Sequence, residues 1–176
     1  GEIATITMGQ SPSSVFYNTS GKGIPLIQGN ADIRNRKSIV RIYTSQITKR
    51  CNAGDLIMSV RAPVGEIGKA SDSSCIGRGV CAIKYSNDFL YHYLIYIEPN
   101  WGKHSSGSTF DSINSDTLKA MEIPVPSLTE QEKICEILSS MDSEIDALNL
   151  KLTKYKSLKK GLMQSLLTGK IRIINK

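Results

Sequence analysis

The stretch TEQEKICEILSSMDSEIDALNLKLTKYKSLKKGLMQSLL (residues 129–167) spaces its apolar residues alternately four and three positions apart. The residues of this seam are Ile134, Leu138, Met141, Ile145, Leu148, Leu152, Tyr155, Leu162 and Leu166, and Lys159 is the polar exception. A period of 3.5 kept over so many turns, in so narrow a stripe, is typical of a coiled coil. We therefore predict one long helix that pairs with another helix along this seam.

Signals for both ends of the helix flank the seam. Pro124 and Pro126 disfavour an earlier start because proline has no backbone donor, and Thr129 with Glu132 forms a capping-box pattern. Gly169 follows the last seam residue and predicts the end of the helix, with a short extended tail after it. At ~1.5 Å per residue, a helix over residues 129–167 spans roughly 58 Å. That is longer than a small domain is wide.

The predicted helix is acidic in its first half and basic in its second half. The acids are Glu130, Glu132, Glu136, Asp142, Glu144 and Asp146, whereas residues 151–172 contain lysines and one arginine but no acid. A partner of like sequence meets opposite charges only if it runs antiparallel, so charge sets orientation more than strength. The alternative is a long helix laid on its own domain, with charges that match the helix dipole. The heptad pattern, however, is longer than the stretch of helix that a domain of this size could cover.

The first 128 residues are enough for one domain with its own core. Runs of β-branched residues between Gly, Pro and Asn turns predict short strands at 2–8, 24–28, 38–44, 55–61, 66–70 and 79–85. An apolar face predicts a helix over 89–98, and a shorter helix is expected from Ser115. The predicted fold class is α+β: a mostly antiparallel β domain at 1–128, then a helical dimerisation and spacer region with a short extended tail at 129–176.

Composition and charge narrow the class of protein. Hydrophobic residues make up 40% of the chain, which fits a folded body, and no apolar run is long enough to span a bilayer. We expect a soluble, cytoplasmic protein without a membrane partner. Cys51, Cys75, Cys81 and Cys135 match no zinc spacing and are expected to be reduced, buried residues. The net charge of +6 favours a polyanionic partner such as nucleic acid.

Three regions carry residue types that suit phosphates and base edges. Between Asp32 and Asp55 the chain has several cations and no acid. A second region places arginines on Pro- and Gly-containing loops, where backbone can approach a ligand closely, and a third, GKHSSGST (102–109), suits a loop that reaches into a groove. The candidate contacts are Asn30, Arg34, Arg36, Lys37, Arg61, Arg78, Lys103, Ser106 and Ser108. For any one of them, a solvated loop position is the alternative.

No catalytic constellation is recognised in the chain. Residues 77–82 fit the pattern GxGxxA, but β-branched residues follow and no helix is expected there to bind a phosphate. Asp55, Glu66 and Lys69 could be assembled into a metal-nuclease set, although acids of this kind usually cap turns. We therefore predict a non-catalytic chain with no cofactor and no metal.

Several stretches together resemble the specificity subunit of type I restriction-modification systems. They are GIPLIQGNADI (23–33), AGDLIMSVRAPVGEIGKA (53–70), CIGRGVCAI (75–83), STFDSINSDTLKAMEIPVPSLTEQEKI (108–134) and LLTGKIRI (166–173). The resemblance covers nearly the whole chain. It is specific because the link from IPVPSL into TEQEKI and a long helix is a hallmark of that family.

The resemblance implies a target-recognition domain for double-stranded DNA, followed by a helical spacer. In that family two such units stand in tandem, their long helices pair antiparallel, and each domain reads one half of a bipartite site. Methyl transfer belongs to the methyltransferase (modification) subunits and cleavage to the restriction subunit. This chain has one unit and no initiating Met, so we expect a half-subunit or a fragment. It would form an antiparallel homodimer or pair with a second similar half.

Two alternative functions stay open. The recognition domain of a single-chain restriction-methylation enzyme would share the same body, but a methyltransferase motif should then precede it, and this chain has none. A coiled-coil module that binds only protein would not need an acid-free basic segment beside polar loops. Salt-dependent binding to a DNA duplex would separate this module from a specificity subunit.

Overall fold

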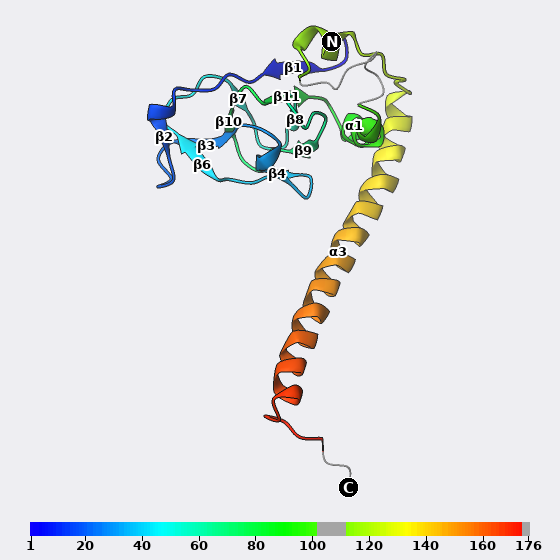
Figure 1. The fold of residues 1–176 in the computed structure, drawn as a ribbon. Coiled ribbons are helices and arrows are strands. Elements are labelled where there is room, and N and C mark those ends of the chain that lie inside the picture. The colour runs from blue at the N-terminus through cyan, green and yellow to red at the C-terminus, as the bar shows by residue number, and fades with distance from the viewer. Residues whose placement is uncertain (102–111, 174–176) are drawn as a thin grey trace. The chain divides into compact units, whose positions relative to one another are not determined.

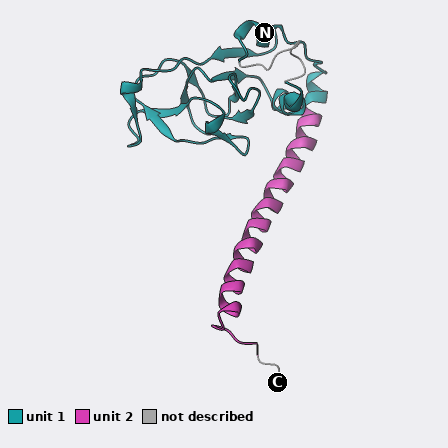
Figure 2. Ribbon diagram, in the orientation of Figure 1, with its two compact units in different colours: residues 1–131 teal, residues 132–176 magenta. Residues whose placement is uncertain are grey.

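The structure is a computed structural model that describes residues 1–101 and 112–173. The chain divides into two units, residues 1–131 and residues 132–176 (Figure 2). The first unit contains the strands and the short helices, and the second contains most of the long helix. Within the described ranges, no helix is long and apolar enough to cross a membrane.

A six-stranded sheet runs through the first unit (Figure 1). Its order is β1 (Thr5–Met8), β11 (Val80–Lys84), β8 (Leu56–Ser59), β9 (Ile67–Lys69), β5 (Lys37–Ser38) and β4 (Ile33–Arg34). Its neighbouring strands are antiparallel except for β5 and β9, which are parallel. Ser59 at the end of β8 faces Val80 at the start of β11. The segment after β8 and the segment before β11 therefore emerge at the same end of the sheet.

A five-stranded sheet lies beside it in the same unit. Its order is β2 (Tyr17–Asn18), β6 (Ile42–Thr44), β3 (Ile24–Ile27), β10 (Ser74–Ile76) and β7 (Arg50–Cys51). Only the pair β3 and β10 is parallel among these described strands. Two 3-10 turns, η1 (Ser14–Phe16) and η2 (Asn30–Asp32), precede β2 and β4. The predicted mostly antiparallel β domain is thus confirmed, with one parallel pair in each sheet.

Both faces of the six-stranded sheet are buried. Along β8, Leu56 and Met58 belong to one core cluster and Ile57, between them, belongs to a second cluster. Side chains alternate between the two faces of a strand. The first cluster includes residues of the helices, such as Leu94, and the second includes Ile76 of the five-stranded sheet. The domain is therefore layered, with helices on one face of the central sheet and the second sheet on the other.

The short helices appear where the sequence predicts them. Helix α1 (Phe89–Ile97) is followed by the 3-10 turn η3 (Glu98–Asn100), and α2 (Ser115–Ala120) begins at the predicted serine. Leu90 and Leu94 of α1 and Leu118 of α2 are buried against the sheet. Burying an apolar side chain of this size contributes roughly 1.5–3 kcal/mol. The two helices thus close one side of the core.

The long helix α3 (Leu128–Leu167) begins one residue earlier than predicted. Ser127 caps it: its hydroxyl accepts a hydrogen bond from the Glu130 backbone N–H at 3.4 Å, and its carbonyl accepts one from Gln131 N–H at 2.9 Å. The Thr129 capping box was therefore wrong. Ser127 is the first residue after Pro126 that can supply a hydroxyl, and serine is a favoured N-cap.

The end of α3 agrees with the prediction. The helix stops at Leu167, and Gly169 adopts a positive φ of 71°. Its N–H donates to the carbonyl of Leu166 at 3.2 Å, which satisfies one of the last helical acceptors. A single unbroken helix therefore carries the whole predicted seam.

Candidate nucleic-acid interface

Two of the predicted contacts, Arg34 and Lys37, face each other on the β4–β5 hairpin at the edge of the six-stranded sheet. Both residues are exposed. The turn between them places Asn35 and Arg36 at positive φ, 49° and 63°. Two positive φ angles in a two-residue turn are typical of the type I′ hairpin. The hairpin presents two cations at a sheet edge, where they can reach a phosphate backbone.

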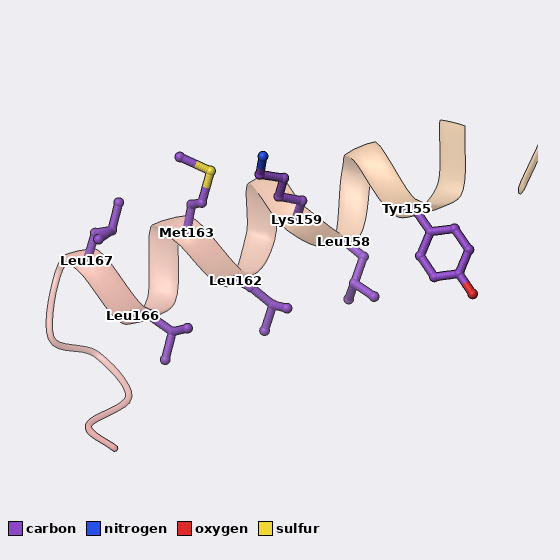
Figure 3. A pocket seen from close by; sticks show the side chains of 7 residues that line it. All are labelled: Tyr155, Leu158, Lys159, Leu162, Met163, Leu166 and Leu167. Atoms are coloured by element: carbon purple, nitrogen blue, oxygen red, sulfur yellow. The ribbon is translucent and has the colours of Figure 1, made fainter. Parts of the chain in front are cut away.

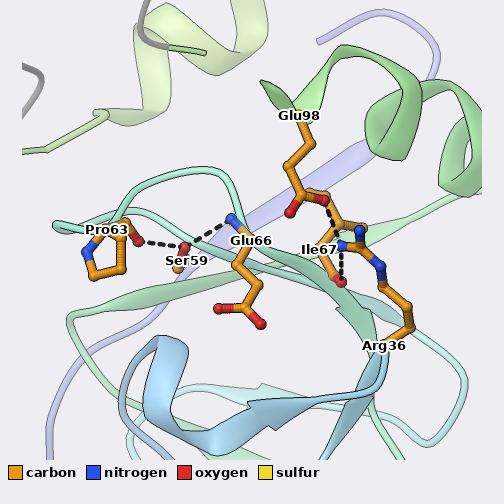
Figure 4. Close-up of polar contacts among 6 residues, drawn as sticks. All are labelled: Arg36, Ser59, Pro63, Glu66, Ile67 and Glu98. Carbon is orange, nitrogen blue, oxygen red and sulfur yellow. Dashed lines mark hydrogen bonds and ion pairs between the residues drawn. The ribbon is translucent and has the colours of Figure 1, made fainter. Parts of the chain in front are cut away.

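Arg36, at the tip of the same hairpin, is held by the protein itself. Its guanidinium Nη1 forms an ion pair with Glu98 and donates to the carbonyl of Ile67 at 3.2 Å (Figure 4). Its side chain is nevertheless 41% exposed. Its charge is partly compensated, unlike the charges of Arg34 and Lys37, for which the described residues show no ion pair.

Glu66 lies near this ion pair (Figure 4). Burial raises the pKa of Glu66 above its ordinary value, and the negative charge of Glu98 raises it further, while Arg36 opposes the shift. The position therefore disfavours the charged carboxylate. Glu66, Glu98 and Arg36 form one electrostatic group next to the hairpin.

A buried hydroxyl fixes the loop that carries Arg61. Ser59 is fully buried; its Oγ donates to the carbonyl of Pro63 at 2.8 Å and accepts from the backbone N–H of Glu66 at 2.9 Å (Figure 4). Arg61 itself is exposed and forms an isolated β-bridge with Ser112. The loop therefore has a defined backbone, from which the Arg61 side chain extends.

Arg61 and Arg78, far apart in sequence, come from adjacent loops. Val60 N–H donates to the carbonyl of Gly79 at 2.9 Å, and Gly77 N–H donates to the carbonyl of Ile27 at 2.8 Å. These bonds, together with the close approach of the Gln28 carbonyl to Gly79, bring residues 28–30, 60–61 and 77–79 next to one another, and we call them the three-loop cluster. Of the predicted contacts, Asn30, Arg61 and Arg78 belong to these three loops. The cluster therefore carries two arginines and one asparagine on loops that are joined by backbone contacts.

Gly79 in this cluster and Gly9 beside it serve packing within the protein. A Cβ added at Gly79 would lie 2.1 Å from the carbonyl oxygen of Gln28, and one added at Gly9 would lie 2.1 Å from the carbonyl oxygen of Gly77. No side chain fits in such contacts. The sequence interpretation expected the loop with Gly77 and Gly79 to let backbone approach a ligand, but the backbone that approaches Gly79 belongs to the chain itself.

Sequence reasoning missed the buried acid of the cluster. Asp32 is 2% exposed and accepts hydrogen bonds from the backbone N–H groups of Gln28 and Gly29, at 2.7 and 3.3 Å. It also pairs with Arg41, a residue of the basic segment. One signal was available, because Asp32 is the lone acid next to a long run without acids. Its burial could not be inferred from that run.

The remaining predictions for single residues have different outcomes. Lys103, Ser106 and Ser108 lie outside the described residues. In the hypothetical nuclease set, Asp55 accepts from the N–H of Asn52 at 2.8 Å, as a turn cap does, and Lys69 pairs with Asp88 at 2.7 Å. No group of three or more metal-ligating side chains occurs among residues 1–101 and 112–173. The GxGxxA match runs into strand β11 and not into a helix.

The seam of α3 lies open in the second unit. Leu148 is 58% exposed and Leu152 is 50% exposed, and of the seam residues only Ile134 is half-buried. Toward the C-terminal end the seam widens into an apolar groove (Figure 3). The groove is lined by Tyr155, Leu158, Lys159, Leu162, Met163, Leu166 and Leu167. Soluble helices rarely expose such a continuous apolar face without a partner.

Known proteins share this combination of a sheet domain and a long helix. The model of the type I restriction modification DNA specificity domain matches residues 1–159. A type I restriction enzyme specificity subunit of Methanocaldococcus jannaschii is 38% identical over 173 residues, which cover 96% of this chain and 41% of the relative. The EcoBI specificity subunit of Escherichia coli is 27% identical over 96% of this chain and 37% of its own length.

Solved structures agree with the sequence relatives. The HsdS subunit of Thermoanaerobacter tengcongensis matches with a TM-score of 0.72 and 33% identity, over 93% of this chain and 42% of that chain. A chain from a structure of complex assembly and conformational transition in a type I R-M system matches with a TM-score of 0.77 and 36% identity, with the same coverage. The fold is thus that of type I specificity subunits. The chain belongs to the type I restriction modification DNA specificity domain family, and it spans about two fifths of the length of these relatives.

Proposed function

We propose that this chain is a DNA target-recognition unit of a type I restriction-modification specificity subunit. It reads one half of a bipartite site and so directs methyltransferase and restriction subunits to that site. The observation that carries the proposal is the presence of two basic surfaces in the sheet domain, the hairpin with Arg34 and Lys37 and the three-loop cluster with Arg61 and Arg78. Cations at loop and hairpin positions suit phosphate contacts, and arginine also suits guanine edges.

In this proposal the chain recognises the DNA sequence and does not catalyse a reaction. The family is defined by DNA specificity, and methyl transfer and cleavage are assigned to the partner subunits. Two residues of the hypothetical nuclease set have structural contacts: Asp55 caps a turn and Lys69 is paired with Asp88.

The exposed seam supports antiparallel pairing with a second copy or with a similar unit of a longer chain. Run antiparallel, the seam is self-complementary: Ile134 would face Leu166 of the partner helix, Leu138 would face Leu162, and Leu148 would face Leu152. The polar exception Lys159 would face Met141, whose flexible side chain can adapt to it. The acidic half of each helix would lie along the basic half of the other. Relatives more than twice as long have room for a second such unit.

Salt-dependent DNA binding tests this function. The full-length subunit with its methyltransferase subunits is titrated against a library of duplexes with randomised segments, at increasing salt. We expect a selected consensus, and a log affinity that falls by about 0.9 per phosphate contact for each tenfold rise in salt. Binding that is independent of salt, or the absence of any selected sequence, would contradict the proposal.

A further inference from the structure

We infer that Asp32 is a positioning residue for DNA reading, which holds the 28–30 loop in place while Arg41 holds Asp32. This inference rests on the proposed function and extends it to residues that themselves need not touch DNA. Asp32 acts through the loop that carries Asn30. The inference concerns the fidelity of reading and not the strength of binding.

Asp32 is a buried charge whose two oxygens are both engaged. Oδ2 accepts from the backbone N–H of Gln28 at 2.7 Å and of Gly29 at 3.3 Å, and Oδ1 accepts from Arg41 Nε. A buried carboxylate is strongly destabilising unless it is paired and hydrogen-bonded. Hydrogen bonds to a charged acceptor are also shorter and stronger than neutral ones. This one side chain therefore constrains the start of the loop strongly.

The same residue closes the other end of the loop. The backbone N–H of Asp32 donates to the carbonyl of Gly29 at 3.0 Å, and its carbonyl accepts from Ile39 N–H at 2.8 Å. Residues 28–32 thus form a closed loop around the Asp32 carboxylate. Asn30, at the start of η2, is half-buried and lies inside this closure.

The loop is also the surface against which the Arg78 turn packs. The Gln28 carbonyl occupies the space next to Gly79, and the side-chain amide of Gln28 donates to the Tyr17 hydroxyl at 3.2 Å. A shift of the loop would therefore displace the turn that carries Arg78 as well. Asp32 controls the relative placement of an amide side chain and a guanidinium, both of which are base-reading groups.

Positioning matters more for bases than for phosphates. A bidentate contact to a base edge requires two hydrogen bonds of defined length and angle. The attraction between a cation and a phosphate falls only slowly with distance. Loosening the loop is thus expected to reduce discrimination between sequences while leaving affinity for random DNA nearly unchanged. A general loss of folding would instead reduce both.

The test compares Asp32→Asn and Arg41→Gln with a control at an exposed ion pair, Asp88→Asn. The control removes an aspartate charge from another ion pair, with Lys69 at 2.7 Å, that lies on no loop of the cluster. Each full-length variant, with its methyltransferase subunits, is presented with the randomised duplex library. Its affinity for the consensus of the parent protein is then compared with its affinity for a shuffled duplex.

For the two cluster variants we expect the ratio of these affinities to fall about tenfold or more, which is the loss of one good base contact. Affinity for the shuffled duplex should stay within about twofold, because Asp32→Asn removes no cation and the charge of Arg41 is already compensated by Asp32. Arg41→Lys, which keeps the charge, should recover part of the ratio. Asp88→Asn should leave it unchanged.

A folded variant that keeps the parent's ratio would overturn the inference. So would an equal loss for both duplexes, which would indicate a merely structural role. If Asp32→Asn does not fold, Arg41→Lys decides the matter, because it keeps a cation beside the buried Asp32 carboxylate while it removes the Arg41 Nε hydrogen bond; the inference then requires its ratio to fall below that of the parent. Failure of the parent protein to select any consensus would reject the proposed function itself, an outcome distinct from the failure of this inference.

Discussion

The Oε1 atom of Gln131 accepts a hydrogen bond from the Tyr85 hydroxyl at 2.9 Å. The same oxygen accepts from Asn87 Nδ2 at 3.1 Å, and Gln131 Nε2 donates to the carbonyl of Pro126 at 2.9 Å. Gln131 is 5% exposed and is the buried residue of α3 among those the structure describes. The first turn of the helix is therefore bonded to the chain just after β11, within the first unit.

Replacing this glutamine should destabilise the domain. Gln131→Ala would leave the half-buried Tyr85 hydroxyl, Asn87 amide and Pro126 carbonyl without their partner. A fully buried unsatisfied group costs about 1–3 kcal/mol, and these partly solvated groups cost less. We expect a lower midpoint of denaturant unfolding for the sheet domain. Gln164→Ala, at an exposed position of the same helix, is the control. Equal midpoints for the two variants would show that the contact is dispensable.

The group around Glu66 predicts a pH-dependent effect. Its pKa is raised above the ordinary value of 4.5, so the folded state binds this proton more tightly than the unfolded state does. The resulting stabilisation is present below the ordinary pKa and is lost as pH rises through the folded-state value. Glu66→Gln should therefore raise the Tm relative to the parent at about pH 7, and have little effect at about pH 3. Thermal unfolding across this range measures both.

Glu136→Gln, on the exposed surface of α3, is the control for that experiment. It removes an acid that is not part of the Arg36 group. A Glu66→Gln protein that is less stable than the parent at neutral pH would mean that the carboxylate contributes a favourable interaction with Arg36 that outweighs burial and the repulsion from Glu98.

The structure of the hairpin predicts that Lys37 and Arg36 contribute differently to the affinity for the DNA phosphates. Lys37→Ala should lower affinity for all duplexes alike and reduce the salt slope by about 0.9, the value for one phosphate contact. Arg36→Ala should reduce it less, because Glu98 already compensates that charge. Glu98→Gln, which frees Arg36, is the matched control and should leave affinity equal or higher. Loss of binding to only one sequence after Lys37→Ala would instead identify a base contact.

Proline in the middle of the seam should abolish pairing. Leu148→Pro removes a backbone donor and kinks the helix, at a cost of about 3 kcal/mol or more. We expect the paired form to be lost in sedimentation experiments while the sheet domain stays folded, because the two are separate units. Leu150→Ala is the control, since Leu150 is 74% exposed and lies off the seam. If the Leu148→Pro protein still pairs, the hypothesis that the helices pair along the seam is wrong.

The length of the seam should set the spacing of the two half-sites. From Ile134 to Leu166 the helix spans roughly 48 Å at ~1.5 Å per residue, or about 14 base pairs at ~3.4 Å each. Deleting one heptad, residues 145–151, shortens it by ~10.5 Å and should bring the half-sites closer by about 3 base pairs. Selection from duplexes with randomised spacers measures this. An unchanged spacer preference would show that the helix does not set the distance.

The elements that sequence reasoning predicts well are those with a strong local period. The strand at Leu56–Ser59, the helix at Phe89–Ile97 and the long helix each carry their signal in consecutive residues. The strands Arg50–Cys51 and Ser74–Ile76 were missed because they are too short to show alternation. They exist through pairing with each other, between segments more than 20 residues apart.

The predicted DNA contacts were limited in the same way, because sequence patterns report only local relationships. Composition found the basic residues, but the pairing of Arg36 with Glu98 joins residues 62 positions apart, and no local pattern carries it. Arg41 was grouped with the cations near it, although its partner is the buried Asp32. Tertiary contacts thus distinguish Arg36 and Arg41, which pair with acids of the chain, from Arg34 and Lys37, for which the described residues show no ion pair. Counting charges in the sequence cannot make this distinction.

The backbone contacts at Gly9 and Gly79 have a consequence for how such a domain can change. Because the loops meet through glycines and main-chain hydrogen bonds, their mutual placement does not depend on the exposed side chains of Arg61 and Arg78. The residues at those two positions can be replaced by other residue types without disturbing the backbone of the loops that carry them. The cluster thus combines a fixed backbone with exposed side chains that can be replaced. New preferences for DNA sequence can therefore arise by single substitutions at Arg61 or Arg78 without a change of fold.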